Sequence, residues 1–191
     1  MTDTQMFAFE SDFVATLRCV PMAVRLKLDL CGIKLSLRQW SRFTRDDRYA
    51  LLVRPCATGP ESEAYRDALT ALIAFRTGDV AKALAEAPCK QWDDPHRVPQ
   101  AVIDYARQVG LEAPTLCRWA ALSRLQRFVL IKLTRDKHDN VNFAPAMREF
   151  GLGAAAFARD ARQTPTAAGV VHRTGEIEAA MSFWMATDVR G

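Results

Sequence analysis

Five cysteines are the residues of this sequence best suited to metal or redox chemistry. Thiolate sulfur is a ligand for zinc and for iron–sulfur clusters. Such sites usually contain two cysteines two to four residues apart, because one turn then directs both sulfurs at one ion. Cys19, Cys31, Cys56, Cys89 and Cys117 include no such pair. We therefore predict reduced, unliganded thiols that pack as small apolar groups, with Cys19, Cys31 and Cys56 kept as the candidate metal ligands.

The histidines and the glycine-containing motifs give no pattern of a catalytic site. His96, His138 and His172 are far apart and form neither HxxxH nor HExxH. The sequence has no GxSxG elbow, no GxGxxG turn and no Walker phosphate loop. His138 lies in the polar stretch RDKHDNVNF, where we interpret it as an ordinary loop histidine. Ser/His/Asp chemistry stays open, but the sequence predicts no catalytic residue and no bound cofactor.

Basic side chains gather in two parts of the chain. One set flanks residues 124–134 and comprises Arg118, Arg124, Arg127, Lys132, Arg135 and Lys137; we interpret most of it as a solvated edge. The other comprises Arg18, Arg25, Lys27 and Lys34, close in sequence to Asp29. We favour ion pairing for this second set, since Arg25 precedes Asp29 by four residues. The alternative is a shallow site for an acidic group of a partner, with Trp184 as a separate apolar anchor.

The second basic set lies in residues 17–37, LRCVPMAVRLKLDLCGIKLSL, around which we expect the chain to be organised. Apolar and charged residues alternate there from Val24 to Leu30, which is a strand pattern. Pro21, however, suits the first turn of a helix, and Gly32 suits the left-handed position just after one. The intervening residues are mostly unbranched at Cβ and favour a helix. We therefore predict a helix between Pro21 and Gly32.

Other elements are predicted from caps and apolar periodicity. Ser123 and Gln126 form a capping box before a stretch that is apolar over most of its helical circumference, which predicts a buried helix over 124–134. Residues 89–99, CKQWDDPHRVP, are interpreted as a long surface loop. The remaining expected helices begin at Ser11, Ser36 and Thr44 or occupy 61–76, 79–87, 99–110, 142–150 and 176–187.

Length and composition indicate a globular protein. The 191 residues are 49% hydrophobic and 25% charged, and no apolar run is long enough to span a bilayer. The acidic N-terminal residues lack the pattern of a secretory signal, and five cysteines fit reduced thiols in the cytoplasm. A net charge of +4 does not indicate nucleic-acid binding, for which a clustered basic face is expected. The predicted fold is all-α: a compact multi-helix domain at 1–152, then a C-terminal appendage at 153–191 made of a connector and a helix.

Two blocks of sequence carry a family resemblance. The first includes Phe9-Glu10, LRCVPM at 17–22, Val24-Arg25, Lys27-Leu28-Asp29, CGIKL at 31–35 and Trp40. The second includes LQRF at 125–128, Ile131-Lys132-Leu133, Asn142-Phe143, Pro145-Ala146 and Glu149-Phe150-Gly151. Together these blocks resemble the nitrate reductase-associated protein family over roughly residues 7–152.

The resemblance implies a non-catalytic, cytoplasmic accessory protein for assimilatory nitrate reductase, which is a molybdenum-cofactor and iron–sulfur enzyme. Such a protein would assist maturation or activity by binding the reductase, as a chaperone, a cofactor-insertion factor or a subunit. The resemblance assigns no catalytic residue to this chain. A small cysteine-dependent metal or redox protein of the same pathway is the alternative, and a nucleic-acid-binding regulator is a weaker one.

Overall fold

The computed structural model describes residues 6–10, 19–85, 89–135 and 141–152. The chain divides into two units, Met1–Ala158 and Arg159–Gly191, and every described residue belongs to the first. The helix predicted to begin at Ser11 and the predicted appendage at 153–191 lie outside the described residues, so they stay predictions. Within the described ranges, no helix has the length and apolar character needed to cross a membrane.

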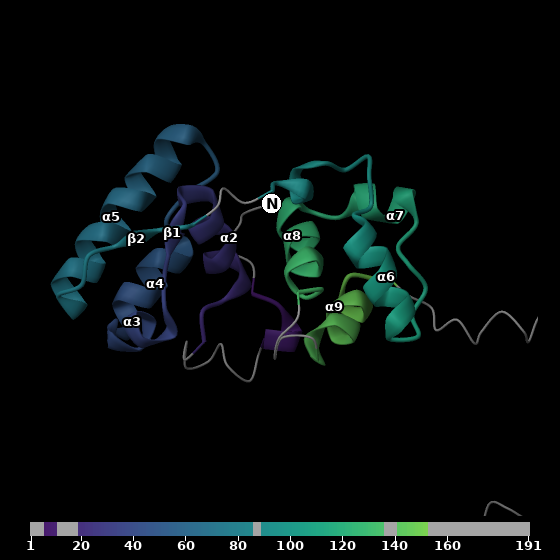
Figure 1. Cartoon of the computed structure of the whole chain (residues 1–191), viewed down its shortest axis with the longest axis horizontal. Helices are drawn as coiled ribbons and strands as arrows, with labels where there is room; N and C mark the ends of the chain where they lie inside the picture. Colours follow the sequence, from purple (N-terminus) through teal and green to yellow (C-terminus); the bar gives the residue numbers. More distant parts are fainter. Residues whose placement is uncertain (1–5, 11–18, 86–88, 136–140, 153–191) are drawn as a thin grey trace, which may run out of the picture. The chain divides into compact units, whose positions relative to one another are not determined.

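The described part of the first unit is predominantly helical, as Figure 1 shows, which confirms the predicted all-α class. Its α-helices are α2 (Met22–Cys31), α3 (Leu37–Arg42), α4 (Arg45–Val53), α5 (Gly59–Thr77), α6 (Gln100–Gln108), α7 (Leu116–Ala121), α8 (Arg124–Lys132) and α9 (Phe143–Glu149). Two 3₁₀ turns, η1 (Ala8–Glu10) and η2 (Gln91–Asp93), and an antiparallel pair of short strands, β1 (Ile33–Lys34) and β2 (Lys82–Ala83), complete it.

Helix α2 has the predicted ends. Pro21 is the N-cap, and Gly32 takes the left-handed conformation at the C-terminal end with φ 70°. The Gly32 N–H donates to the carbonyl of Leu28 and so satisfies one of the last carbonyls of the helix. A Cβ at position 32 would also lie 3.1 Å from Arg66 Nη2. The strand alternative suggested by the alternating pattern is therefore excluded.

Several helices begin at capping boxes. In a capping box, the side chain of the N-cap residue and that of the third helical residue each accept a hydrogen bond from the backbone N–H of the other. Ser123 and Gln126 form the predicted one, and Thr44, a predicted helix start, forms one with Asp47. Ser36 forms another, with Gln39. A fourth joins Thr58 to Glu61, and it starts α5 two residues earlier than the predicted range, at Gly59. These caps set the positions of the helices along the chain.

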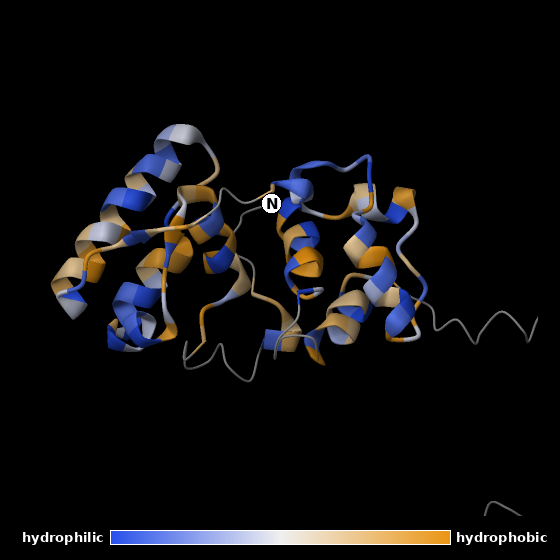
Figure 2. Ribbon diagram, viewed as in Figure 1, coloured by the Kyte–Doolittle hydropathy of each residue, from blue (hydrophilic) through white to orange (hydrophobic). Residues whose placement is uncertain are grey.

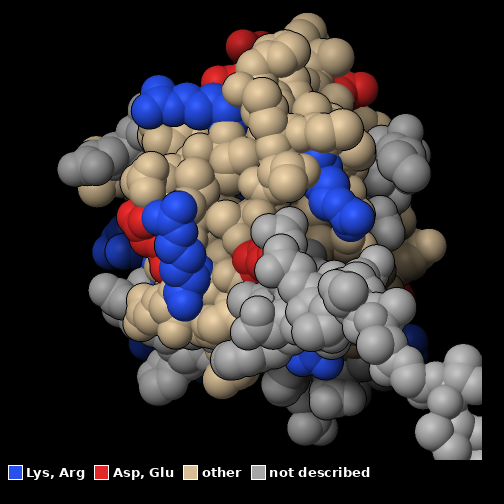
Figure 3. All heavy atoms as spheres, turned by 90° about the vertical axis from the view of Figure 1, so that its right-hand side faces the viewer, with Lys and Arg blue, Asp and Glu red and all other residues tan. Residues whose placement is uncertain are grey.

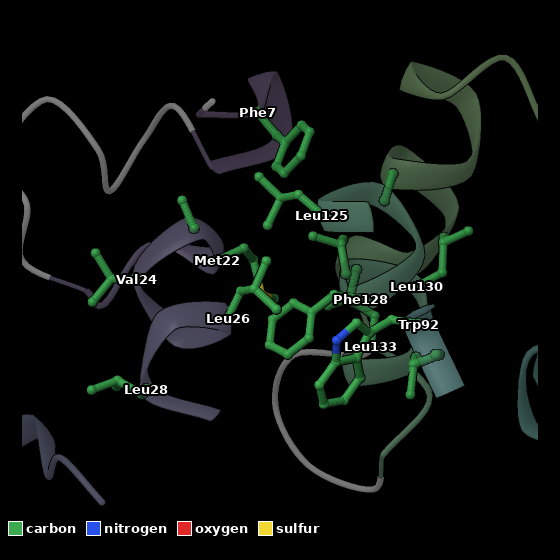
Figure 4. Close-up of a cluster of buried hydrophobic side chains, with 14 of the residues drawn as sticks. Phe7, Met22, Val24, Leu26, Leu28, Trp92, Leu125, Phe128, Leu130 and Leu133 are labelled. Atoms are coloured by element: carbon green, nitrogen blue, oxygen red, sulfur yellow. The ribbon is translucent and has the colours of Figure 1, made fainter. Parts of the chain in front are cut away.

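The core lies where α2 and α8 contact each other, and Figure 4 shows Leu26 of α2 beside Phe128 of α8, whereas Val24 and Leu28 lie on the opposite side of α2. Leu26, Phe128 and Leu130 are fully buried there. Helix α8 also contacts α6, α9 and η2, whereas α2 contacts α4 and α5. This arrangement confirms the prediction that the helix after Ser123 lies inside the domain.

The prediction of a helix over 79–87 is wrong for the residues that the structure describes. Residues 82–83 form β2, which pairs with β1 in the register Ile33 to Ala83 and Lys34 to Lys82. The Leu84 N–H extends this pairing by donating to the carbonyl of Gly32 at 2.9 Å. A partner some fifty residues earlier in the chain thus determines the conformation, which local helix propensity could not reveal.

The prediction of a surface loop over 89–99 is wrong at its centre. Trp92, in η2, is fully buried and packs edge-to-face against Phe128, with ring centroids 5.1 Å apart. Arg127 holds this turn in place, because its Nε donates to the carbonyl of Trp92 at 2.8 Å. The segment is therefore part of the core, although its charged residues Asp93 and Asp94 remain exposed.

Candidate binding surface

The five cysteines divide into two buried and three exposed thiols. Cys31 and Cys56 are buried, whereas Cys19, Cys89 and Cys117 are exposed. Burial, together with a smaller effect of nearby Cys56, raises the pKa of the Cys31 thiol to about 11. The raised pKa keeps the Cys31 thiol protonated, whereas the thiolate is the form that binds metals. Its position in the core therefore favours a neutral thiol that packs as an apolar group. Across the described ranges, no group of three or more His, Cys, Asp or Glu side chains is arranged to hold a metal ion.

Lys27 is a structural residue of the core. Its side chain is 1% exposed, and Nζ donates to the carbonyls of Leu52 at 2.5 Å and Arg54 at 2.8 Å. The ammonium thus satisfies two carbonyl groups at the C-terminal end of α4 and fixes that end to α2. Lys27 was predicted as a partner-binding residue, and its burial removes it from that set.

The predicted ion pair between Arg25 and Asp29 is replaced by a different one. Lys132 Nζ of α8 lies 2.6 Å from Asp29 Oδ2, whereas Arg25 Nε donates to the carbonyl of Val20 at 3.1 Å. Arg127, expected at a solvated edge, is buried and also donates from Nη1 to the carbonyl of Leu122. Cations predicted from sequence to face solvent thus stabilise the interior instead.

Two glutamates join the N-terminal turn to distant helices. Glu10 accepts hydrogen bonds from the N–H groups of Met22 at 2.8 Å and Phe7 at 3.4 Å. Burial raises the pKa of Glu10, although these hydrogen bonds oppose the rise. Glu149, at the end of α9, accepts from Ala8 N–H at 2.9 Å. The turn is therefore held against both α2 and α9, and Glu149 joins it to the other end of the region that carries the family resemblance.

The remaining predicted partner-binding residues are placed differently. Lys34 is exposed in β1, directly opposite Lys82 of β2. Like charges facing each other across a strand pair destabilise it, so this pair would gain from an acidic group. Arg18 and Trp184 lie outside the described residues. Three of the four tryptophans, Trp40, Trp92 and Trp119, are fully buried core residues.

A hollow between α3 and the end of α5 gathers cations that the sequence analysis did not select. It has a volume of about 100 Å³ and is lined by Arg38, Gln39, Arg42, Arg76, Thr77 and Asp79. The available sequence signal was the spacing of Arg38 and Arg42, four residues apart on one face of a helix. The contribution of Arg76 could not be found this way, because it depends on how α5 packs against α3.

A second hollow of about 200 Å³ lies beside η2 and the start of α6. Its walls include one acid and one base, Asp94 and Arg97, together with Pro99. Figure 3 shows the face on the α6 and α7 side, where the basic side chains stand apart from one another on a largely uncharged surface. The cations around the hollow at α3 are therefore the more concentrated feature.

Comparison with known proteins gives one match. Residues 6–150 match the family described as conserved nitrate reductase-associated protein. The chain belongs to this family. No curated protein and no solved structure matches the chain. The family match begins at the N-terminal turn and ends within the turn after α9, the two segments that Glu149 brings together.

Proposed function

We propose that this chain is a non-catalytic accessory protein that binds nitrate reductase and assists its maturation or activity in the cytoplasm. The observation that carries the proposal is the family match, which extends over residues 6–150 and names association with nitrate reductase. Almost the whole described fold lies within that match, so the proposal concerns the helical domain itself.

The buried charged residues form hydrogen bonds with the backbone, which supports a role in binding rather than in catalysis. Lys27 and Arg127 donate to backbone carbonyls, and Glu10 accepts from backbone N–H groups. Each of these groups therefore stabilises the fold. Catalytic side chains are instead expected to face a pocket in which a substrate is held. The exposed cations Lys34, Arg38 and Arg42 are available for contact with another protein.

A binding protein can assist an enzyme that must receive large cofactors. The reductase polypeptide has to stay open until its cofactors have entered, and an accessory protein that binds the open form shifts the population toward it. On this proposal the chain stabilises the immature reductase and dissociates once the cofactors are in place. It needs no cofactor of its own.

A deletion strain tests the proposal. We expect the reductase polypeptide to be present at a normal level but weakly active, with activity restored by the wild-type gene in trans. The same strain carrying Phe128→Ala, which removes a core side chain, should be restored poorly. Full reductase activity and normal growth on nitrate in the deletion strain would refute the proposal.

A pull-down from cells grown on nitrate tests the physical association. The tagged chain should retain the reductase, and more of it when molybdenum is withheld, because the cofactor-free enzyme then accumulates. An Arg107→Glu variant, which changes an exposed residue of α6, should retain the reductase as well as the wild-type chain does. Equal retention of loaded and cofactor-free enzyme would contradict a role in maturation but leave a role as a subunit.

A further inference from the structure

The hollow at α3 is built from arginines that belong to two different helices. Arg38 and Arg42 come from α3, and Arg76 comes from the last turn of α5. Cations four residues apart on one helix repel each other, so the pair on α3 costs the isolated helix some stability. Neither side chain forms an ion pair or a hydrogen bond with any residue in the described ranges. Both guanidinium-bearing residues therefore line the hollow without an ion pair to a carboxylate of the described ranges.

The remaining wall of the hollow is fixed by hydrogen bonds. Arg76 makes a two-point contact with Asp47, with Nε to Oδ2 at 2.8 Å and Nη2 to Oδ1 at 3.1 Å. Gln39 Nε2 donates to Asp79 Oδ2 at 3.1 Å. Because Asp47 neutralises Arg76 and Asp79 is the only acid in the wall, the charge that remains there is positive. This wall is therefore fixed before any ligand arrives, and only the exposed side chains of Arg38 and Arg42 have to be ordered on binding.

Exposed apolar side chains adjoin this basic site. Phe75 is 78% exposed, and its ring lies 4.9 Å from the guanidinium carbon of Arg76. Leu37 and Val80, the chain neighbours of Arg38 and Asp79, are 60% and 83% exposed. Figure 2 shows the same relationship, with the apolar last turns of α5 beside the polar helix α3. Arginine and aromatic residues together are typical of the parts of interfaces that contribute most to affinity.

We infer that this site docks an acidic segment of nitrate reductase, with one carboxylate side chain in the hollow and apolar neighbours against Phe75, Leu37 and Val80. The inference rests on the proposed function and adds to it the surface used and the chemistry of the partner. A volume of about 100 Å³ accommodates a carboxylate but is well below the roughly 300 Å³ or more of sites for cofactor-sized ligands. Two guanidinium groups match a carboxylate geometrically, because each presents paired N–H donors.

The test measures binding of the purified full chain to purified, cofactor-free nitrate reductase at low and at high salt. Arg38→Glu combined with Arg42→Glu should weaken the affinity at least about tenfold and reduce its salt dependence. The matched control combines Arg107→Glu with Arg148→Glu, which changes the net charge equally on α6 and α9 and should have little effect. Phe75→Ala should weaken binding without changing the salt dependence. If the charge reversal impairs folding, Arg38→Gln with Arg42→Gln replaces it.

Each outcome has a distinct meaning. Binding that survives the reversal at α3, or that falls equally in the control pair, overturns the inference and leaves the proposed function intact. Failure of the wild-type chain to bind the reductase overturns both. Inorganic phosphate and nitrate are titrated separately against the wild type and the reversed variant. A rise in melting temperature confined to the wild type would identify a small-anion site and overturn the docking of a protein segment.

Discussion

Asp29 of α2 and Lys132 of α8 form an ion pair across the two central helices, with Oδ2 and Nζ 2.6 Å apart. Both side chains are largely buried, at 11% and 18% exposure. The Lys132 ammonium also lies 5.3 Å from the centroid of the Phe128 ring, which adds a cation–π contact. The pair thus fixes the relative positions of α2 and α8 beside the apolar core.

Lys132→Met should destabilise the domain, because it leaves the carboxylate of Asp29 partly buried without its cation. We expect a loss of about 1–3 kcal/mol in the free energy of unfolding, between the values for exposed and for fully buried pairs. Urea denaturation measures it. The control is Arg107→Met, which removes an exposed pair with Asp104 at 3.8 Å and should cost well under about 1 kcal/mol. Equal losses in the two variants would show that the pair across α2 and α8 contributes no more to the free energy of unfolding than an exposed pair does.

Phe128→Ala should cost about 3–5 kcal/mol, because it deletes a fully buried aromatic side chain and leaves a cavity against Trp92. Phe75→Ala is the matched control. Its ring is 78% exposed, so its removal should change stability by no more than about 0.5 kcal/mol. The shift in the urea midpoint of each variant decides the matter. A Phe128→Ala protein as stable as the wild type would mean that α8 is not the core helix.

The two classes of cysteine should differ in their reaction with iodoacetamide. At pH 8 the exposed thiols of Cys19, Cys89 and Cys117 should be modified in the folded protein. Cys31 should react only after denaturation, because it is buried and its pKa of about 11 leaves almost no thiolate. Mass spectrometry of peptides gives the order of modification. Rapid labelling of Cys31 in the folded chain would contradict its placement.

The raised pKa of Cys31 also predicts a dependence of stability on pH. The unfolded chain releases this proton near the ordinary value of 9.0, whereas the folded chain retains it until about 11. Between these values the unfolded state binds fewer protons, so the stability that Cys31 contributes is lost as pH rises through this window. Cys31→Ala should lack that part of the slope.

Anaerobic purification followed by metal analysis tests whether the thiols bind a metal. We expect no bound metal, and one zinc or iron per chain that disappears in Cys31→Ser would support the metal alternative.

The sequence by itself determined most of the local structure. Pro21 and Gly32 delimit α2, and Ser123 with Gln126 starts α8, because a cap uses only residues within one helical turn. The apolar circumference of α8 likewise predicted its burial. The family resemblance could also be detected from the sequence, because its motifs are short and keep their order along the chain.

Tertiary structure decided which charged residues are structural and which are available for binding. Lys27 and Arg25 are two residues apart and both carry a positive charge, yet only Lys27 meets the carbonyl groups at the end of α4 and is buried. Lys132 reaches Asp29 only because α8 packs on α2, and Arg76 joins Arg38 only because α5 packs on α3. Such contacts depend on the packing of distant segments, and the desolvation of a charge depends on all of its neighbours together. No spacing along the sequence encodes them.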